Sequence, residues 1–281
     1  MTEFSMPTAE QRAFWAAIRA NPDDDTVRLV YADWLEENGD EARAEFIRVQ
    51  IEQTGMFSPS ALCSDPNDRT LTKREKRLIA RHGERWLQPL YDILQPTERS
   101  FPWAYSRRQV KFARGFPRDI AISLQSACAL ATHDSDIEPL NDVKIDQGFL
   151  PTEKATARIT EVARWANAAC ITEISTYDAT DGFVKGLVGG FLTRLHHLDL
   201  HSGSVSDAGA ILLANWQQAA FRMLDLSDNR ITNTGAVALA ESPHASNLSN
   251  LNLNSNLIGP DGRRRLRERF GKDVQIEAGP T

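Results

Sequence analysis

Three residues near the C-terminus have types and a spacing that could bind a metal ion. His197, Asp199 and His201 stand two residues apart, and two imidazoles with one carboxylate form a known transition-metal ligand set. On one face of an extended strand, the first and third of these residues lie roughly 13 Å apart at the backbone. The three side chains would converge only with a twist or a bulge. A metal-dependent activity is therefore a weaker hypothesis than the two binding functions described below, which are protein binding and nucleic-acid binding.

The other reactive residue types do not form a catalytic pattern. The sequence has no H-E-x-x-H, G-x-S-x-G, Walker or paired-cysteine motif. Gly186-x-x-Gly189-Gly190 is too irregular for a dinucleotide fingerprint, and His196 has the opposite strand parity from His197, so it faces inward. We therefore predict a non-catalytic protein without a cofactor.

Composition and cysteine usage indicate the compartment. The apolar runs are all shorter than the roughly 18 residues of a membrane helix, and residues 1–11 lack the basic start and apolar stretch of a secretion signal. Cys63, Cys128 and Cys170 are odd in number and widely scattered, as is typical of reduced thiols. We expect a cytoplasmic protein that makes no membrane contact.

A repeated apolar pattern must position these polar residues. The pattern L-x-x-L-x-L, with Phe in one first position, occupies residues 195–200, 221–226 and 248–253, so its starts lie 26 and 27 residues apart. Leucine-rich repeats have this pattern and period, with one strand and one helix in each unit. A single unit cannot bury its own apolar face, so the units must stack into a solenoid. Glycines keep nearly the same interval, at Gly182, Gly209, Gly235 and Gly262.

Weaker copies extend the pattern in both directions. They predict strands near residues 120, 143 and 174, before those near 198, 224 and 251, and a terminal strand at 274–276. Each clear unit continues into a helix, whose cap is expected from Asp207 or from the residues between Thr232 and Thr234. A full helix in a unit of about 27 residues is similar to the ribonuclease-inhibitor type of repeat. The arginine-rich residues 263–272 are interpreted as a polar outer cap helix.

Strand alternation predicts which side chains reach the concave face of the solenoid. If Leu198 and Leu200 point inward, the residues between and beside them point outward. The resulting surface is polar and mildly acidic. It suits a protein or peptide that carries hydrogen-bond donors or positive charge, and it would repel phosphate. The alternative is a solvated face without a partner. The predicted partner-binding residues are Glu173, Ser175, Tyr177, His197, Asp199, His201, Met223, Asp225, Ser227, Asn250, Asn252 and Asn254.

Residues 8–54 predict three helices. Thr8 is a suitable N-cap, residues 21–23 break the first helix, and residues 38–39 end the second. We expect Tyr31 and Trp34 to be core aromatics, with Asp33 paired to an arginine such as Arg28 or Arg43. The apolar stripe of the second helix is predicted to contain Val27, Val30, Tyr31, Trp34 and Leu35.

One segment of this region resembles a known family. The string RLVYADWLEENGDEARAEFIRVQ at 28–50, followed by RHGERWLQPL at 81–90 and ARGFP at 113–117, is similar to the bacterial repeat-companion domain. This module typically precedes leucine-rich or other repeats. The resemblance spans roughly residues 8–122, supports a helical module in front of the repeats, and implies no catalytic activity or ligand.

Charge is distributed in opposed blocks. Residues 1–68 carry 5 Lys/Arg against 14 Asp/Glu, a balance of −9, and residues 69–118 carry 13 against 4, a balance of +9. We expect the acidic and basic blocks to attract each other and to form contacts within the chain. In residues 69–118 the basic residues also alternate with aromatics around 101–105, a footprint of single-strand nucleic-acid binding. The competing interpretation is that these aromatics cap the open end of the solenoid.

Together these patterns predict an α/β protein with three parts. Residues 1–54 form a helical repeat-companion module, residues 55–119 a basic helical bridge and solenoid cap, and residues 120–281 a short leucine-rich-repeat solenoid. Parallel strands are expected on the concave face and helices on the convex face. We predict an interaction module that binds a protein or peptide on the concave face, with nucleic-acid binding through residues 69–118 as the alternative.

Overall fold

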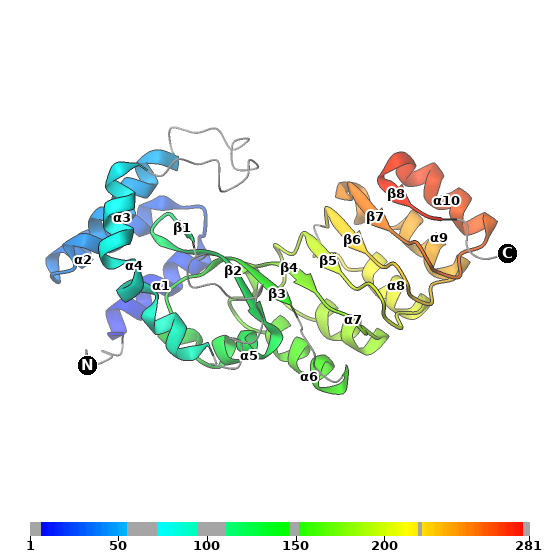
Figure 1. Cartoon of the computed structure of the whole chain (residues 1–281), viewed down its shortest axis with the longest axis horizontal. Helices are drawn as coiled ribbons and strands as arrows, with labels where there is room; N and C mark the ends of the chain where they lie inside the picture. The colour runs from blue at the N-terminus through cyan, green and yellow to red at the C-terminus, as the bar shows by residue number, and fades with distance from the viewer. Residues whose placement is uncertain (1–6, 55–71, 95–110, 147–151, 219–220, 278–281) are drawn as a thin grey trace. The chain divides into compact units, whose positions relative to one another are not determined.

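The chain divides into two compact units, each described here by itself (Figure 1). The computed structural model describes residues 7–54, 72–94, 111–146, 152–218 and 221–277. The first unit comprises the described parts of Met1–Thr97, Ser106–Ile120 and His133–Asn141. The second comprises the described parts of Ala121–Thr132 and Asp142–Thr281. Strand β2 (Phe116–Ser123) begins in the first unit and ends in the second.

The described part of the first unit combines helices with an antiparallel hairpin. Thr8 caps α1 in a capping box with Gln11, as predicted for the N-cap, and Gly39 follows α2 with a φ of 86°, which glycine adopts without strain. Strand β1 pairs with the start of β2. The elements are α1 (Ala9–Ala20), α2 (Asp25–Glu37), α3 (Glu41–Thr54), α4 (Lys73–Ile93), β1 (Lys111–Ala113) and the short helix η3 (Asp134–Asp136).

An aromatic core holds the first three helices together. Tyr31 is buried, stacks on Phe116 with ring centroids 6.2 Å apart, and accepts a hydrogen bond from Trp15 Nε1. Trp34 packs at the edge of this core. The predicted apolar stripe of α2 is wrong at Val30, which is 51% exposed. The buried side is completed by Arg28, because its guanidinium donates to the carbonyl groups of Pro22 and Asp24.

A second buried arginine lies among aromatic rings in the same unit. The Arg43 guanidinium lies 4.8 Å from the centroid of the Trp86 ring and 5.5 Å from that of Phe112. It forms an ion pair with Glu138, and burial raises the pKa of Glu138 although Arg43 partly offsets this. The expected pairing of Asp33 with an arginine is confirmed, but the partner is neither Arg28 nor Arg43. Asp33 pairs instead with Arg48 at 2.6 Å on the surface.

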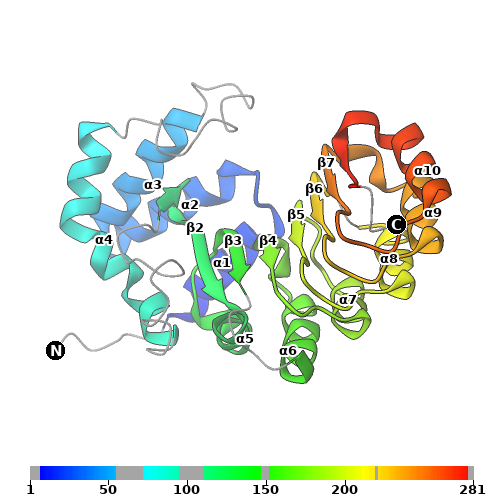
Figure 2. The same ribbon diagram turned by 45° about the vertical axis from the view of Figure 1, so that its right-hand side comes forward.

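The second unit alternates parallel strands with helices. After α5 (Leu124–Thr132), each strand from β3 to β7 pairs in parallel with the next one along the chain. Figure 2 shows helices α7–α10 on one side of strands β4–β7. The strands are β3 (Asn141–Asp146), β4 (Ile171–Ser175), β5 (His197–Asp199), β6 (Met223–Asp225), β7 (Asn250–Asn252) and β8 (Val274–Gln275). The helices are α6 (Thr152–Ala163), α7 (Asp181–Val188), α8 (Asp207–Ala214), α9 (Asn233–Glu241) and α10 (Pro260–Phe270), with η4 (Ala168–Cys170), η5 (Ala245–Asn247) and η6 (Gly271–Asp273).

The repeat register that the leucines predicted is confirmed. Leu198 pairs with Ile174 on one side and with Leu224 on the other, and Leu224 pairs with Leu251. All four side chains are buried toward the helices. The chain then turns at equivalent points through a residue of positive φ, which short polar residues adopt more readily than bulky ones. These residues are Asp178, Ser202, Asp228 and Ser255.

Side chains at the start of each helix connect neighbouring units. Asp181 in the first turn of α7 accepts hydrogen bonds from the backbone N–H groups of Ser206 and Gly209 in the next unit. Asp207 and Asn233 make equivalent contacts one and two units later. The prediction that Asp207 caps its own helix is therefore wrong: Ser206 caps α8, and Asp207 binds the start of α9. The predicted cap at Thr232 is confirmed for α9.

Buried asparagines satisfy the backbone between the strands and the helices. The Asn229 amide oxygen accepts from Val205 N–H, and its Nδ2 donates to the carbonyl groups of Leu200 and Leu226. Asn256 makes the same contacts one unit later. The preceding unit has Gly203 at this position. A Cβ on Gly203 would lie 2.7 Å from the carbonyl oxygen of Ala179, so the position has no space for a side chain.

Candidate functional site

The exposed side chains of strands β4–β7 line up across the sheet in register. One row consists of Glu173, His197, Met223 and Asn250, and a second consists of Ser175, Asp199, Asp225 and Asn252. The remaining predicted residues follow the strands directly, at Tyr177, His201, Ser227 and Asn254. We call these twelve residues the strand-face ladder. Each of them is half-buried or exposed, in contrast to the buried leucines between them.

Two carboxylates occupy the middle of the ladder on adjacent strands. Asp199 and Asp225 are register partners, so their side chains leave neighbouring strands side by side. Asp225 accepts hydrogen bonds from the backbone N–H of Ser227 at 2.8 Å and from Nδ2 of Asn252 at 2.8 Å. Asp199 accepts from the backbone N–H of His201 at 3.1 Å. Hydrogen bonds within and between strands therefore hold both carboxylates in fixed orientations on the exposed face.

Two exposed apolar side chains flank these carboxylates. Tyr177 is 44% exposed and Met223 is 40% exposed. The Tyr177 ring meets the His201 ring edge to face, with centroids 4.9 Å apart. Tyrosine and methionine are enriched at protein interfaces, where they provide contact area without a charge. The ladder therefore combines fixed negative charge with adaptable apolar contacts.

The histidines of the ladder contact different carboxylates. His201 Nδ1 lies 2.7 Å from Asp199, whereas His197 Nδ1 lies 3.8 Å from Glu173. Within the described ranges, no group of three or more His, Cys, Asp or Glu side chains is arranged to hold a metal ion. His196 is half-buried, and burial lowers its pKa. The geometry therefore does not support a metal site at His197, Asp199 and His201.

The cysteines lack the features of an activated thiol wherever the structure describes them. Cys170 is buried, and burial raises the pKa of Cys128 to about 12. A thiol with such a raised pKa stays protonated at neutral pH and is a poor nucleophile. The third predicted thiol, Cys63, lies outside the described residues.

The sequence pattern missed the ends of the ladder. Lys144 pairs in register with Glu173, to which it also forms an ion pair at 3.1 Å, and Asp146 pairs in register with Ser175. At the other end, Gln275 follows Asn252 in the same row. The same alternation rule applied to the weak repeat at 140–145 would have found the first two of these residues.

Some described basic residues of segment 69–118 form ion pairs with carboxylates of residues 1–68 within the first unit. Arg74 forms an ion pair with Glu45, and Arg85 forms one with Asp40 at 2.8 Å. Arg114 lies 3.5 Å from Asp25. These contacts join the acidic and basic blocks of the sequence, as the charge pattern predicted. The aromatic stretch 101–105 lies outside the described residues.

Comparison with known proteins agrees with the repeat pattern. A family model described as Leucine Rich repeat matches residues 221–240, which cover one whole apolar motif, the turn after it and most of α9. No curated protein matches the chain. In the described ranges, no helix is long and apolar enough to cross a membrane. The C-terminal part of the chain is therefore a mixed α/β array that contains leucine-rich repeat sequence, a class that commonly mediates protein–protein interaction.

Proposed function

We propose that this chain is a non-catalytic interaction protein that binds a protein or peptide partner on the strand-face ladder. The observation that carries the proposal is the register of Asp199 with Asp225, flanked by exposed Tyr177 and Met223. Fixed carboxylates beside apolar contacts fit a partner surface that presents lysine or arginine. A basic side chain can direct its charged end to the carboxylates and lay its aliphatic stem against Tyr177 and Met223.

The charge of the ladder supports a basic partner over nucleic acid. Glu173, Asp199 and Asp225 give the face negative charge, and Lys144 already forms an ion pair with Glu173. Phosphate would meet like charge on this face. Complementary charge also steers the encounter of the two partners, so the association rate should fall as ionic strength rises.

The architecture around the ladder is part of the same proposal. We propose that residues 120–281 form a solenoid with the ladder on its concave face, and that residues 1–54 are a bacterial repeat-companion module. Residues 55–119 then form the bridge to the solenoid and its terminal cap. We place the whole protein in the cytoplasm. Repeat arrays need a terminal cap to cover the open end of their core. The three-helix core around Tyr31 and the resemblance of residues 28–50 support the assignment of the module.

A triple substitution on the ladder tests the function. Asp199→Ala, Asp225→Ala and Asn252→Ala together remove two carboxylates and one amide from the central row. Tagged full-length protein should capture a specific partner from an extract, and the triple variant should lose at least 90% of that capture. The variant should retain its structure, because the row is half-exposed and the buried leucines beneath it are unchanged.

The matched control removes the same groups elsewhere. Glu153→Ala, Glu241→Ala and Asn247→Ala delete two carboxylates and one amide from exposed positions off the ladder. This control should capture the partner as well as the unchanged protein does. Equal capture by all three proteins would contradict the proposal, and equal loss in both variants would assign the interaction to overall charge.

A further inference from the structure

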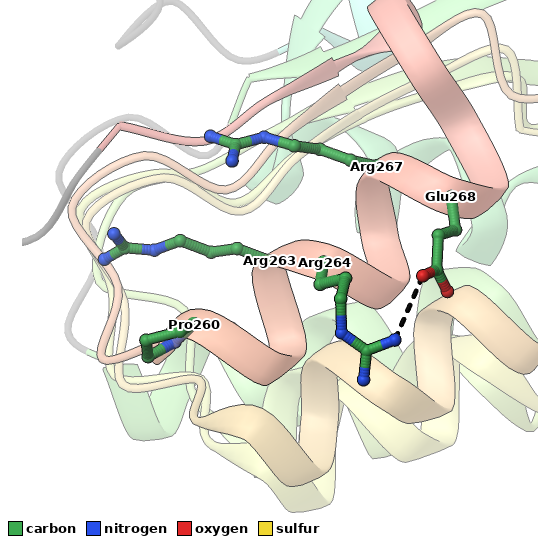
Figure 3. A pocket seen from close by; sticks show the side chains of 5 residues that line it. All are labelled: Pro260, Arg263, Arg264, Arg267 and Glu268. Carbon is green, nitrogen blue, oxygen red and sulfur yellow. Dashed lines mark hydrogen bonds and ion pairs between the residues drawn. The ribbon is translucent and has the colours of Figure 1, made fainter.

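A hollow on the last helix presents arginines to the surface, away from the strand-face ladder. It lies along α10, has a volume of about 540 Å³, and is lined by Pro260, Arg263, Arg264, Arg267 and Glu268. Figure 3 shows the side chains of Arg263 and Arg267 extended in the same direction, whereas Arg264 turns toward Glu268. Residues four apart share one face of a helix, so the side chains of Arg263 and Arg267 leave α10 from the same face.

The three arginines differ in how their charge is satisfied. Arg264 donates to Glu268 at 3.0 Å and lies 3.9 Å from Asp261, so its charge has carboxylate partners. Among the described residues, Arg267 donates to a backbone carbonyl alone, that of Ile276 at 3.5 Å. The Nε atom of Arg263 is buried and has no hydrogen-bond partner in the part of the chain that the structure describes. Because a buried Nε cannot reach a ligand, the donors available to an anion are the terminal guanidinium nitrogens of Arg263 and Arg267, which form no ion pair with the described residues.

We propose that Arg263 and Arg267 bind a short acidic segment of a partner protein. A guanidinium presents a planar fork of donors that matches a carboxylate with two parallel hydrogen bonds. The two residues are separated by about 6 Å along the helix axis, from a rise of about 1.5 Å per residue. Alternate residues on one side of an extended peptide are separated by about 6.6 Å. The spacing matches an extended segment with acidic residues at alternate positions.

The same geometry disfavours nucleic acid as the occupant. The hollow includes Glu268, and the side chain of Asp261 at the start of the helix is 86% exposed, so a uniformly charged polyanion meets repulsion. The lining residues include no aromatic ring for base stacking. Two arginines also neutralise too few phosphates for useful affinity at physiological salt. Carboxylates at alternate positions of a peptide need no aromatic ring, and two of them can each pair with one arginine, with uncharged residues between them reducing the repulsion.

Fluorescence anisotropy with labelled peptides tests the proposal on the full chain. The probe is a peptide with glutamates alternating with serines, compared with the same peptide carrying glutamines and with an oligothymidine of equal length. The acidic peptide should bind saturably. The double variant Arg263→Gln and Arg267→Gln should weaken binding at least 10-fold. The control Arg265→Gln and Arg230→Gln, which loses the same charge from exposed positions outside the hollow, should change it less than 2-fold.

Each other outcome overturns the proposal. No saturable binding of the acidic peptide, or equal weakening by the two double variants, rules out the site. If oligothymidine binds more tightly than the acidic peptide, and the Arg263→Gln and Arg267→Gln variant weakens that binding at least 10-fold, the hollow binds nucleic acid. If that variant does not fold, the pair Arg263→Lys and Arg267→Lys decides. It keeps the charge but loses the fork, so affinity should fall at least 3-fold, and unchanged affinity contradicts the proposal.

Discussion

The carboxylate of Asp207 accepts both the hydroxyl and the backbone N–H of Thr232, at 2.6 and 2.8 Å, across the boundary between two repeats. Burial by itself would raise the pKa of Asp207. The hydrogen bonds from Thr232 and from the backbone of Gly235 outweigh this effect, so the pKa lies below the ordinary value of 3.8. The contact therefore stabilises the folded chain more when Asp207 is ionised than when it is protonated.

Removing this carboxylate should destabilise the repeats in a pH-dependent way. Asp207→Ala should lower the free energy of unfolding by about 1–2 kcal/mol at neutral pH, because it leaves donors of the next helix unpaired. A depressed folded-state pKa contributes stability above the unfolded value, and that stability is lost as pH falls through the folded value. The difference between the two proteins should therefore shrink below about pH 4, as measured by urea denaturation at pH 7 and pH 3.

The chain provides its own control for this prediction. Asn233 makes the equivalent contacts with a neutral amide oxygen, at 2.9 Å to Gly259 N and 3.2 Å to Gly262 N. Asp207→Asn should therefore retain most of the stability while lacking the acid dependence of this contact. A loss in Asp207→Asn as large as that in Asp207→Ala would contradict the hydrogen-bond account.

The buried amide of Asn229 should be essential to the stability of the second unit. Asn229→Ala should lower the free energy of unfolding by about 2–3 kcal/mol, because Val205 N–H and the carbonyl of Leu200 lose their partner where water cannot replace it. The exposed Asn247→Ala should change stability by less than about 0.5 kcal/mol. Chemical denaturation of the three proteins measures both values, and similar effects of the two substitutions would refute the prediction.

Two adjacent glycines should respond differently to the same substitution. A Cβ on Gly190 would lie 2.2 Å from the backbone oxygen of Ala163, whereas one on Gly189 meets only Lys185 O at 4.0 Å. Gly190→Ala should therefore destabilise by about 2–3 kcal/mol through overpacking. Gly189→Ala should be neutral or slightly stabilising, because alanine has less freedom than glycine in the unfolded chain. Melting temperatures that fall equally would show that the close approach does not exist.

The Arg43–Glu138 ion pair should matter far more than the surface pair of Asp33. Glu138→Ala should destabilise the first unit by about 3–5 kcal/mol, because the Arg43 guanidinium remains among aromatic rings without a counter-charge. Asp33→Ala should cost less than about 1 kcal/mol, since the Asp33 side chain is 66% exposed and Arg48 also pairs with Glu36. Thermal unfolding followed by tryptophan fluorescence measures both. Comparable shifts would show that burial adds nothing to the first pair.

The repeat part of the fold was predictable because its signal is local and periodic. The motifs at 195–200, 221–226 and 248–253 place one buried side chain per strand at a fixed position, and stacking then sets the register of Leu198, Leu224 and Leu251. The outward row follows from alternation alone. The pairing of Asp199 with Asp225 is thus predictable from the sequence.

Other features depend on contacts that no local pattern encodes. Arg43 and Glu138 are 95 residues apart, and neither residue type predicts burial by itself. Val30 fits the helical period of α2, yet Arg28 takes the buried side because backbone carbonyl groups satisfy its guanidinium. Asp207 has the residue type of a helix cap, but its partner belongs to the following unit. In each case the deciding partner is set by tertiary packing.

The contact between Asp207 and Thr232 also allows the number of repeats to change. Asp181 binds Ser206 and Gly209 with the same geometry by which Asp207 binds Thr232 and Gly235. Excising the 26 residues from Ser206 to Ile231 would bring Asp181 to a threonine and a glycine of matching chemistry. A family built on such joints can gain or lose whole modules by recombination while every remaining junction stays complementary.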